Sequence, residues 1–142
     1  MSRVLVVANE TVGAEELLAE IRRIEDRRTS KFHVLAPAVA GEHGLGTWNQ
    51  EGAIQHAQQR LDKTIALLRS EGLDATGQVG DMVPLAAIED ALRTFPADMI
   101  VISTHPVARS RWLKKDLVES ARKKFARPVV HVVSHVSENA PA

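Results

Sequence analysis

A cluster of polar and basic side chains follows the apolar run at residues 99–104, where a buried strand is expected to open into a loop and a helix. Thr104 and His105 stand at that point, and the strong hydrogen-bond donors that follow are Arg109, Ser110 and Arg111. A guanidinium group binds phosphate or carboxylate through a planar fork of N–H donors, and a hydroxyl or imidazole adds single hydrogen bonds. The segment Asp98–Asp116 is therefore the leading prediction for a functional site, and its chemistry favours an anionic ligand.

Three more positions join this prediction because they follow other expected strands. Asn9 and Thr11 come after the first strand, and Val39 comes after the second. Ligands of open parallel sheets bind outside the carboxyl ends of the strands, where the strand order reverses. The expected ligand-binding residues are therefore Asn9, Thr11, Val39, Thr104, His105, Arg109, Ser110 and Arg111.

The sequence carries no familiar catalytic or metal-binding motif. It has no cysteine, no His-Glu-x-x-His motif, no Gly-x-Ser-x-Gly turn and no lysine-containing phosphate loop. His131 and His135, in the last expected strand and directly after it, would lie about 13 Å apart in extended chain, too far to share one metal ion. We therefore predict no catalytic residue and no metal ligand, and binding is favoured over catalysis.

Charge is distributed unevenly along a chain that is neutral as a whole. The 142 residues include 18 basic and 18 acidic side chains, whereas the stretch from Arg109 to Arg127 has eight basic residues against two acidic ones, a local net charge of +6. The basic run indicates either a solvated helix face or an anion-binding surface. The overall balance gives no reason to expect binding to nucleic acid or to an anionic membrane.

Five short apolar segments, rich in Val and Ile, are typical of buried parallel strands. Segments with helical periodicity separate them, and strict alternation of strands and helices favours a parallel sheet covered by helices on both faces. We therefore predict a single α/β domain over residues 1–136, followed by a frayed tail over 137–142. The expected strands are Arg3–Ala8, Lys31–Ala36, Thr76–Val79, Met99–Thr104 and Val129–Ser134.

Apolar residues at three- and four-residue spacing predict the buried face of each helix. Asp81 is the expected N-cap of the third helix, Gly72 the residue that ends the second, and Gly80 the residue that lets the third strand turn. The loop from Pro37 to Gln50 is long enough to be a lid over a site, which the sequence leaves open. The four stripes are Leu17, Leu18, Ile21 and Ile24; Ile54, Ala57, Leu61, Ile65 and Leu68; Leu85, Ile88 and Leu92; and Leu113, Leu117, Ala121 and Phe125.

Length and composition fit a soluble protein with one core. Apolar residues make up 44% and charged residues 25% of the chain, and the absence of cysteine excludes disulfides and thiolate chemistry. The early apolar run is too short for a signal-peptide core or a membrane span. We therefore expect a cytoplasmic protein without membrane contact.

The order and spacing of these segments resemble the universal stress protein family, within the adenine-nucleotide alpha-hydrolase-like group. The resemblance spans nearly the whole chain and implies a five-stranded sheet of order 3-2-1-4-5. It also implies a homodimer paired through the last strand, Val129 to Val133, which would be an aggregation hazard if its apolar edge stayed uncovered. The matching segments are Arg3–Ala8, Gly80-Asp81, Ala97–Ile102 with Thr104-His105, and Arg127–Val133.

ATP-binding members of this family carry a loop of pattern G-x2-G-x9-G-S/T after the fourth strand. Here the loop is degenerate, because Ser103, Pro106, Asp116 and Leu117 occupy the positions of the glycines and the hydroxyl residue, and Asn9 replaces an acidic residue that contacts adenine. These replacements oppose backbone binding of phosphate, so ATP or AMP is a possible but doubtful ligand. The side chains of Arg109 and Arg111 could replace the lost amide donors.

Three functional hypotheses follow. The leading one is a universal stress-like module that binds or senses a small anion, possibly a nucleotide, without robust catalysis. The second is a ligand-free homodimeric interaction module in which Asp116 caps the last helix. The third is a phosphoanhydride or phosphoester hydrolase with Thr104, His105 and Arg109 near the reacting group.

Overall fold

The computed structural model describes residues 2–8, 14–24, 26–38, 50–81, 83–104 and 111–133. Within these ranges, only the backbone is described at residues 14, 50, 51, 53, 104, 111–116 and 133. The expected tail therefore lies outside the described residues, as does most of the loop between Pro37 and Gln50.

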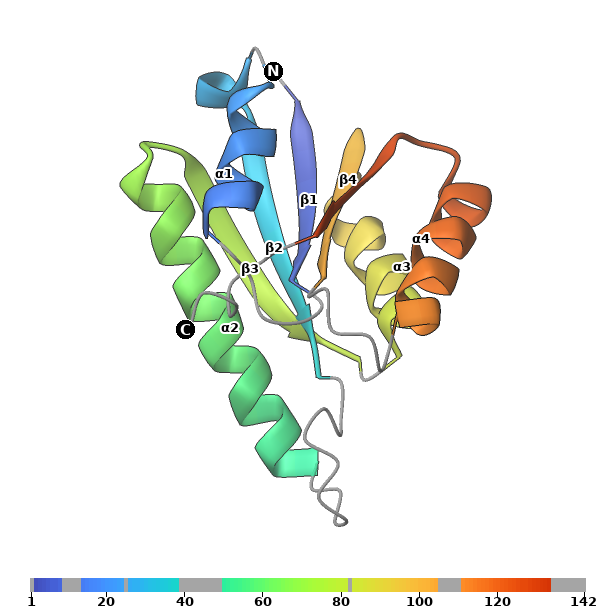
Figure 1. Ribbon diagram of the computed structural model, residues 1–142. Helices are drawn as coiled ribbons and strands as arrows, with labels where there is room; N and C mark the ends of the chain where they lie inside the picture. The colour runs from blue at the N-terminus through green and yellow to red at the C-terminus, as the bar shows by residue number, and fades with distance from the viewer. Residues whose placement is uncertain are drawn as a thin grey trace, which may run out of the picture.

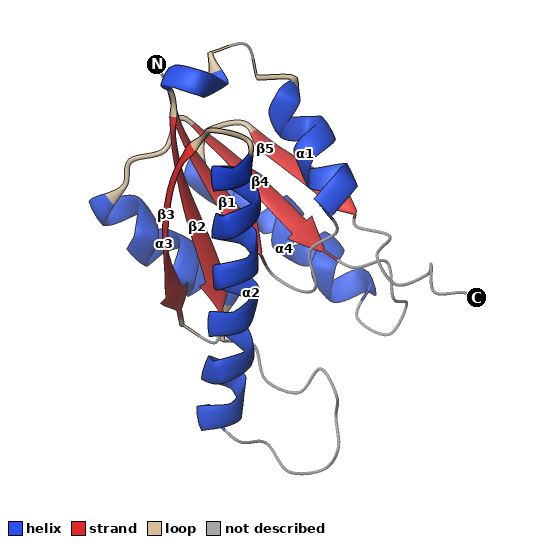
Figure 2. Cartoon of the chain, turned by 90° about the vertical axis from the view of Figure 1, so that its left-hand side faces the viewer, coloured by secondary structure: helices blue, strands red, loops and turns tan. Residues whose placement is uncertain are grey.

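The strands form one parallel five-stranded sheet of order β3-β2-β1-β4-β5, as Figure 2 shows across the width of the molecule. The predicted fold class and strand order are therefore confirmed. The order reverses at β1, because the chain first winds outward through β2 to β3 and then returns to β4 on the other side. The strands are β1 (Arg3–Ala8), β2 (Lys31–Pro37), β3 (Asp74–Gly80), β4 (Met99–Thr104) and β5 (Val129–Val133).

Two pairs of helices cover the sheet, one pair on each face (Figure 1). One core lies between the sheet and the first two helices and includes Leu17, Phe32 and Leu68. The other lies between the sheet and the last two helices and includes Leu35 and Ile88. The helices are α1 (Ala14–Arg22), α2 (Gln50–Ser70), α3 (Pro84–Thr94) and α4 (Arg111–Phe125), with a short 3-10 helix η1 (Arg27–Thr29) after α1.

The predicted stripe of α2 is wrong at one end. Ala57, Leu61 and Leu68 are buried, but Ile54 is 42% exposed. The 21 residues of α2 span about 31 Å, whereas the seven residues of β2 span about 23 Å, so the first turns of the helix extend beyond the sheet, as Figure 1 shows. Ile54 therefore has no sheet beneath it to cover its side chain.

The residues at the helix ends confirm one prediction and correct two. Gly72 has φ +80°, and the amides of Gly72 and Leu73 donate to the carbonyls of Arg69 and Leu68, so Gly72 ends α2 as expected. Asp81 is not the N-cap of α3, because Val83 holds that position and donates its amide to Asp81 Oδ1 at 2.9 Å. The predicted turning role of Gly80 is replaced by a packing role.

Gly80 is required because of space. A Cβ atom added there would lie 2.7 Å from Leu35 Cδ1 and 2.8 Å from Ala87 Cβ, whereas the φ of Gly80 is not in the left-handed region. The absent side chain lets α3 approach the end of β3 closely. The residue thus sets the distance between helix and sheet next to the carboxyl edge.

Candidate functional site

The carboxyl ends of β1 and β4 lie side by side at the point where the strand order reverses. Ala8 pairs with Ser103, and Ser103 pairs in turn with Val132 of β5. On the other side of β1, Pro37 pairs with Gly80, and the amide of Ala38 donates to the Gly80 carbonyl at 3.1 Å. We call this row of strand ends the carboxyl edge, and its switch point is where a parallel sheet of this kind holds a ligand.

The structure places only part of the predicted ligand set. Thr104 is the last residue of β4 and Arg111 the first residue of α4, and the side chains of both lie outside the description. The remaining residues of the set stay predictions, because they lie outside the described ranges: Asn9, Thr11, Val39, His105, Arg109 and Ser110.

The degenerate phosphate loop has two ends that the structure describes. Ser103, at the first glycine position, is fully buried at the end of β4, whereas Leu117, at the hydroxyl position, is 8% exposed and packs in the core. Leu117 thus contributes to packing and offers no hydrogen-bond donor. Pro106, at the second glycine position, lies outside the described residues.

Asp116 does not cap α4. The helix begins at Arg111, so Asp116 is its sixth residue and lies beyond the first turn. A carboxylate there is too far along the helix to accept the first free amides, which are those of the first four residues. The hypothesis of a ligand-free interaction module is therefore wrong in giving Asp116 the role of helix cap.

Asp98, the first residue of the predicted segment, does not lie at the carboxyl edge. Its Oδ2 accepts the Arg3 amide at 2.9 Å, and its own amide donates to the Arg3 carbonyl at 2.8 Å. These contacts join the amino ends of β1 and β4, about 20 Å along the chain from Thr104. Asp98 therefore has a structural role at the opposite edge, and the carboxyl edge begins at Ser103.

Arg60 is a residue of the carboxyl edge that sequence reasoning missed. It projects from α2, where its Nε donates to the Ala8 carbonyl at 3.1 Å and its Nη2 donates to the Pro37 carbonyl at 2.7 Å. A half-buried guanidinium thus bridges the ends of β1 and β2, beside the switch point. It holds two strand ends together and places positive charge where the sequence predicts an anion.

The basic run near the end of the chain does not form one surface. Arg111 stands at the start of α4, by the carboxyl edge, whereas Arg122, Lys123 and Lys124 stand in its last turn. The helix is 15 residues long, so its two ends lie about 22 Å apart. Only the first part of the run can serve a ligand at the carboxyl edge.

The described ranges meet neither the requirements of a metal site nor those of a membrane-spanning helix. Within them, no group of three or more His, Asp or Glu side chains is arranged to hold a metal ion. None of the helices in that part of the chain has the length and apolar character needed to cross a bilayer.

Solved structures with the same fold come from universal stress proteins. The universal stress protein of Archaeoglobus fulgidus in complex with dAMP is 23% identical, with a TM-score of 0.60, and the match covers 93% of this chain and 97% of that one. A second structure of a universal stress protein from the same organism is 21% identical, with a TM-score of 0.61, covering 93% and 98%. No protein-family model and no curated protein matches the sequence. The chain therefore has the fold of the universal stress proteins.

Proposed function

We propose that this protein is a binding or regulatory module that holds a small anionic ligand at the carboxyl edge, without robust catalysis. The observation that carries the proposal is the position of Arg60. Its guanidinium lies at the ends of β1 and β2, next to the switch point between Ala8 and Ser103. An anion at this point would meet a fixed positive charge beside the strand ends.

The start of α4 supplies a second source of positive potential. The helix begins seven residues after the end of β4, and its N-terminus carries the positive end of the helix dipole. Arg111 adds a full charge at that terminus. Both features favour a phosphate or carboxylate over a neutral ligand.

An adenine nucleotide is the first ligand to test. The structural neighbour from Archaeoglobus fulgidus was solved in complex with dAMP. The replaced loop glycines weaken binding through backbone amides, so we assign phosphate binding in this chain to side chains, with Arg109 and Arg111 as the leading contacts. The mononucleotides AMP and dAMP are therefore better first ligands than ATP, whose longer phosphate chain depends more on such amides.

Calorimetric titration of dAMP, AMP and ATP tests the proposal, after mass spectrometry of small molecules released from freshly purified protein. We expect saturable binding of at least one nucleotide, and a loss of about tenfold in affinity in Arg109→Ala, the usual effect of removing one charge-assisted hydrogen bond. If none of the three ligands gives a binding heat and no nucleotide is released from the purified protein, a nucleotide is excluded as the ligand. If Arg109→Ala binds the nucleotide with full affinity, the phosphate group does not bind at the loop that contains Arg109.

The edge of β5 favours a second function, association with another copy of the chain. β5 pairs with β4 alone within the described sheet, and its sequence is Val-Val-His-Val-Val. An uncharged edge strand of this kind pairs readily with another strand. A homodimer joined through Val129 to Val133 would cover it and is compatible with ligand binding at the carboxyl edge.

A further inference from the structure

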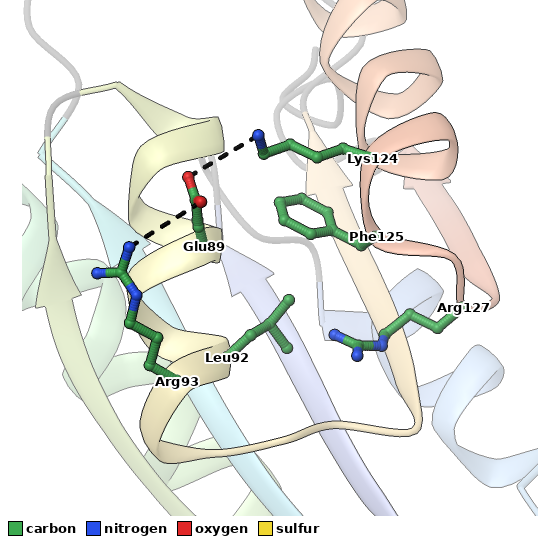
Figure 3. A pocket seen from close by; sticks show the side chains of 6 residues that line it. All are labelled: Glu89, Leu92, Arg93, Lys124, Phe125 and Arg127. Carbon is green, nitrogen blue, oxygen red and sulfur yellow. Dashed lines mark ion pairs between the residues drawn. The ribbon is translucent and has the colours of Figure 1, made fainter.

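A groove of about 410 Å³ lies between α3 and α4, away from the carboxyl edge (Figure 3). It is formed by the final turns of both helices and by the residue that leads into β5. Helices that join parallel strands run back along the sheet, so these turns lie near the amino ends of the strands. The lining residues are Glu89, Leu92, Arg93, Lys124, Phe125 and Arg127.

The lining carries more positive than negative charge. Glu89 is the single acidic residue among the six, and it lies 4.0 Å from Arg93 and 3.9 Å from Lys124. Arg93 is also paired with Asp90 at 2.8 Å. Two of the three cations thus share a carboxylate, and the six lining residues keep a formal charge of +2.

Arg127 is the cation whose surroundings point to a ligand. It is half-buried, and no hydrogen bond or ion pair joins its guanidinium to the described part of the chain. In Figure 3 the guanidinium points into the groove, toward Leu92. A partly desolvated cation gains more than a fully hydrated one from an anionic partner, because less of its hydration remains to be displaced.

The backbone directly before Arg127 makes a left-handed turn. Ala126 has φ +47°, in the left-handed region that residues with a Cβ rarely adopt. α4 ends at Phe125, Ala126 follows it, and Arg127 lines the groove together with Phe125. The strain is held by the packing of Phe125 in the core below.

The floor of the groove is apolar. Phe125 is 9% exposed, and Leu92 packs against the same core from α3. Figure 3 shows the Phe125 ring below Lys124, and Leu92 beside the guanidinium of Arg127. An aromatic ring laid on this floor would lie against the Phe125 ring and the Leu92 methyl groups.

We propose that this groove is a second ligand site, which binds a small aromatic anion with its ring on Leu92 and Phe125 and its acid group against Arg127. The volume lies within the range of small-molecule sites. The site is independent of the nucleotide proposal, since its residues lie at the opposite end of α3 and α4 from the carboxyl edge.

Calorimetry with phenyl phosphate as the probe tests the site, with benzoate as a second aromatic anion. Two half-ligands serve as controls: phenol, which has the ring alone, and inorganic phosphate, which has the acid group alone. We expect saturable binding of an aromatic anion and at least tenfold weaker binding of both half-ligands. Failure of phenyl phosphate and benzoate to bind would overturn the proposal. Inorganic phosphate that binds as tightly as phenyl phosphate would also overturn it, because the apolar floor would then contribute nothing.

Variants of the full chain locate the bound probe. Arg127→Gln should weaken phenyl phosphate about tenfold, Glu89→Gln should tighten it two- to threefold, and Lys123→Gln, which removes the same charge from α4 outside the groove, should leave it unchanged. If Arg127→Gln and Lys123→Gln lose the same affinity for phenyl phosphate, the effect reflects the overall charge of the protein and the proposed site is refuted. Unchanged affinity for phenyl phosphate in Arg127→Gln would place the probe outside the groove and refute the site as well.

Discussion

Replacing Arg60 by methionine separates the structural from the binding role of this residue. Methionine keeps much of the apolar stem and removes the donors to the carbonyls of Ala8 and Pro37. A hydrogen bond from a charged donor contributes about 1.5–3 kcal/mol to stability. Because Arg60 is only half-buried, water can replace part of its hydrogen bonding to the two carbonyls in the variant. We therefore expect the free energy of unfolding to fall by about 2–3 kcal/mol in total.

Arg69→Met is the matched control. Arg69 lies on the same helix, about 14 Å further along, and donates from Nε and Nη2 to a single sheet carbonyl, that of Ala75, at 3.1 and 2.8 Å. It is an exposed residue with one acceptor, so its loss should lower the unfolding free energy by only about 1–2 kcal/mol. Its contacts lie at the start of β3, away from the carboxyl edge.

Urea denaturation and nucleotide titration, performed on both variants, give the two readouts. We expect both variants to lose stability, but only Arg60→Met to lose affinity for dAMP, by about tenfold, because only Arg60 lies at the carboxyl edge. Equal affinity in the two variants would refute the binding role of Arg60. An unchanged unfolding free energy in Arg60→Met would refute its role in holding the strand ends.

The remaining predictions concern packing, backbone strain and assembly. Gly80→Ala should lower the unfolding free energy by about 1–3 kcal/mol in urea, because the new methyl group would overlap Leu35 and Ala87; an unchanged midpoint would contradict the packing role. Ala126→Gly should raise it by about 0.5–1 kcal/mol, since relief of the left-handed strain exceeds the added chain entropy; destabilisation would argue against strain. His131→Glu should shift sedimentation toward the monomer, because a pair of β5 edges would bring like charges together, and a dimer of undiminished stability would exclude this edge as the interface.

Periodicity and composition were sufficient for most elements of the fold. The bounds of β1 and β4 agree with the predicted segments, because their apolar runs are continuous and buried on both faces. β3 was predicted two residues short at its start, since Asp74-Ala-Thr-Gly-Gln-Val-Gly has weak strand character at the edge of the sheet. Its length is set by pairing with β2, from Lys31 opposite Asp74 to Pro37 opposite Gly80, which no local pattern contains.

The candidate site was harder to predict for the same reason. Arg60 is one of 18 basic residues, and its role exists only because α2 passes over the ends of β1 and β2. Asp98 was included in the predicted site because it precedes β4 in the chain, whereas the site lies at the other end of that strand. The expected parallel sheet already indicated the carboxyl ends of the strands, and the contacts between Asp98 and Arg3 show that Asp98 lies at the amino end of β4.

The central claim is that a nucleotide binds at the carboxyl edge, and amide chemical shifts of isotope-labelled protein during a dAMP titration test it most directly. We expect saturable shifts of the amides of Ala8, Ser103 and Thr104, with little change at Arg3 and Asp98 on the opposite edge. Saturable shifts confined to Arg3, Asp98 or the groove between α3 and α4, or no shifts at all, would contradict the claim.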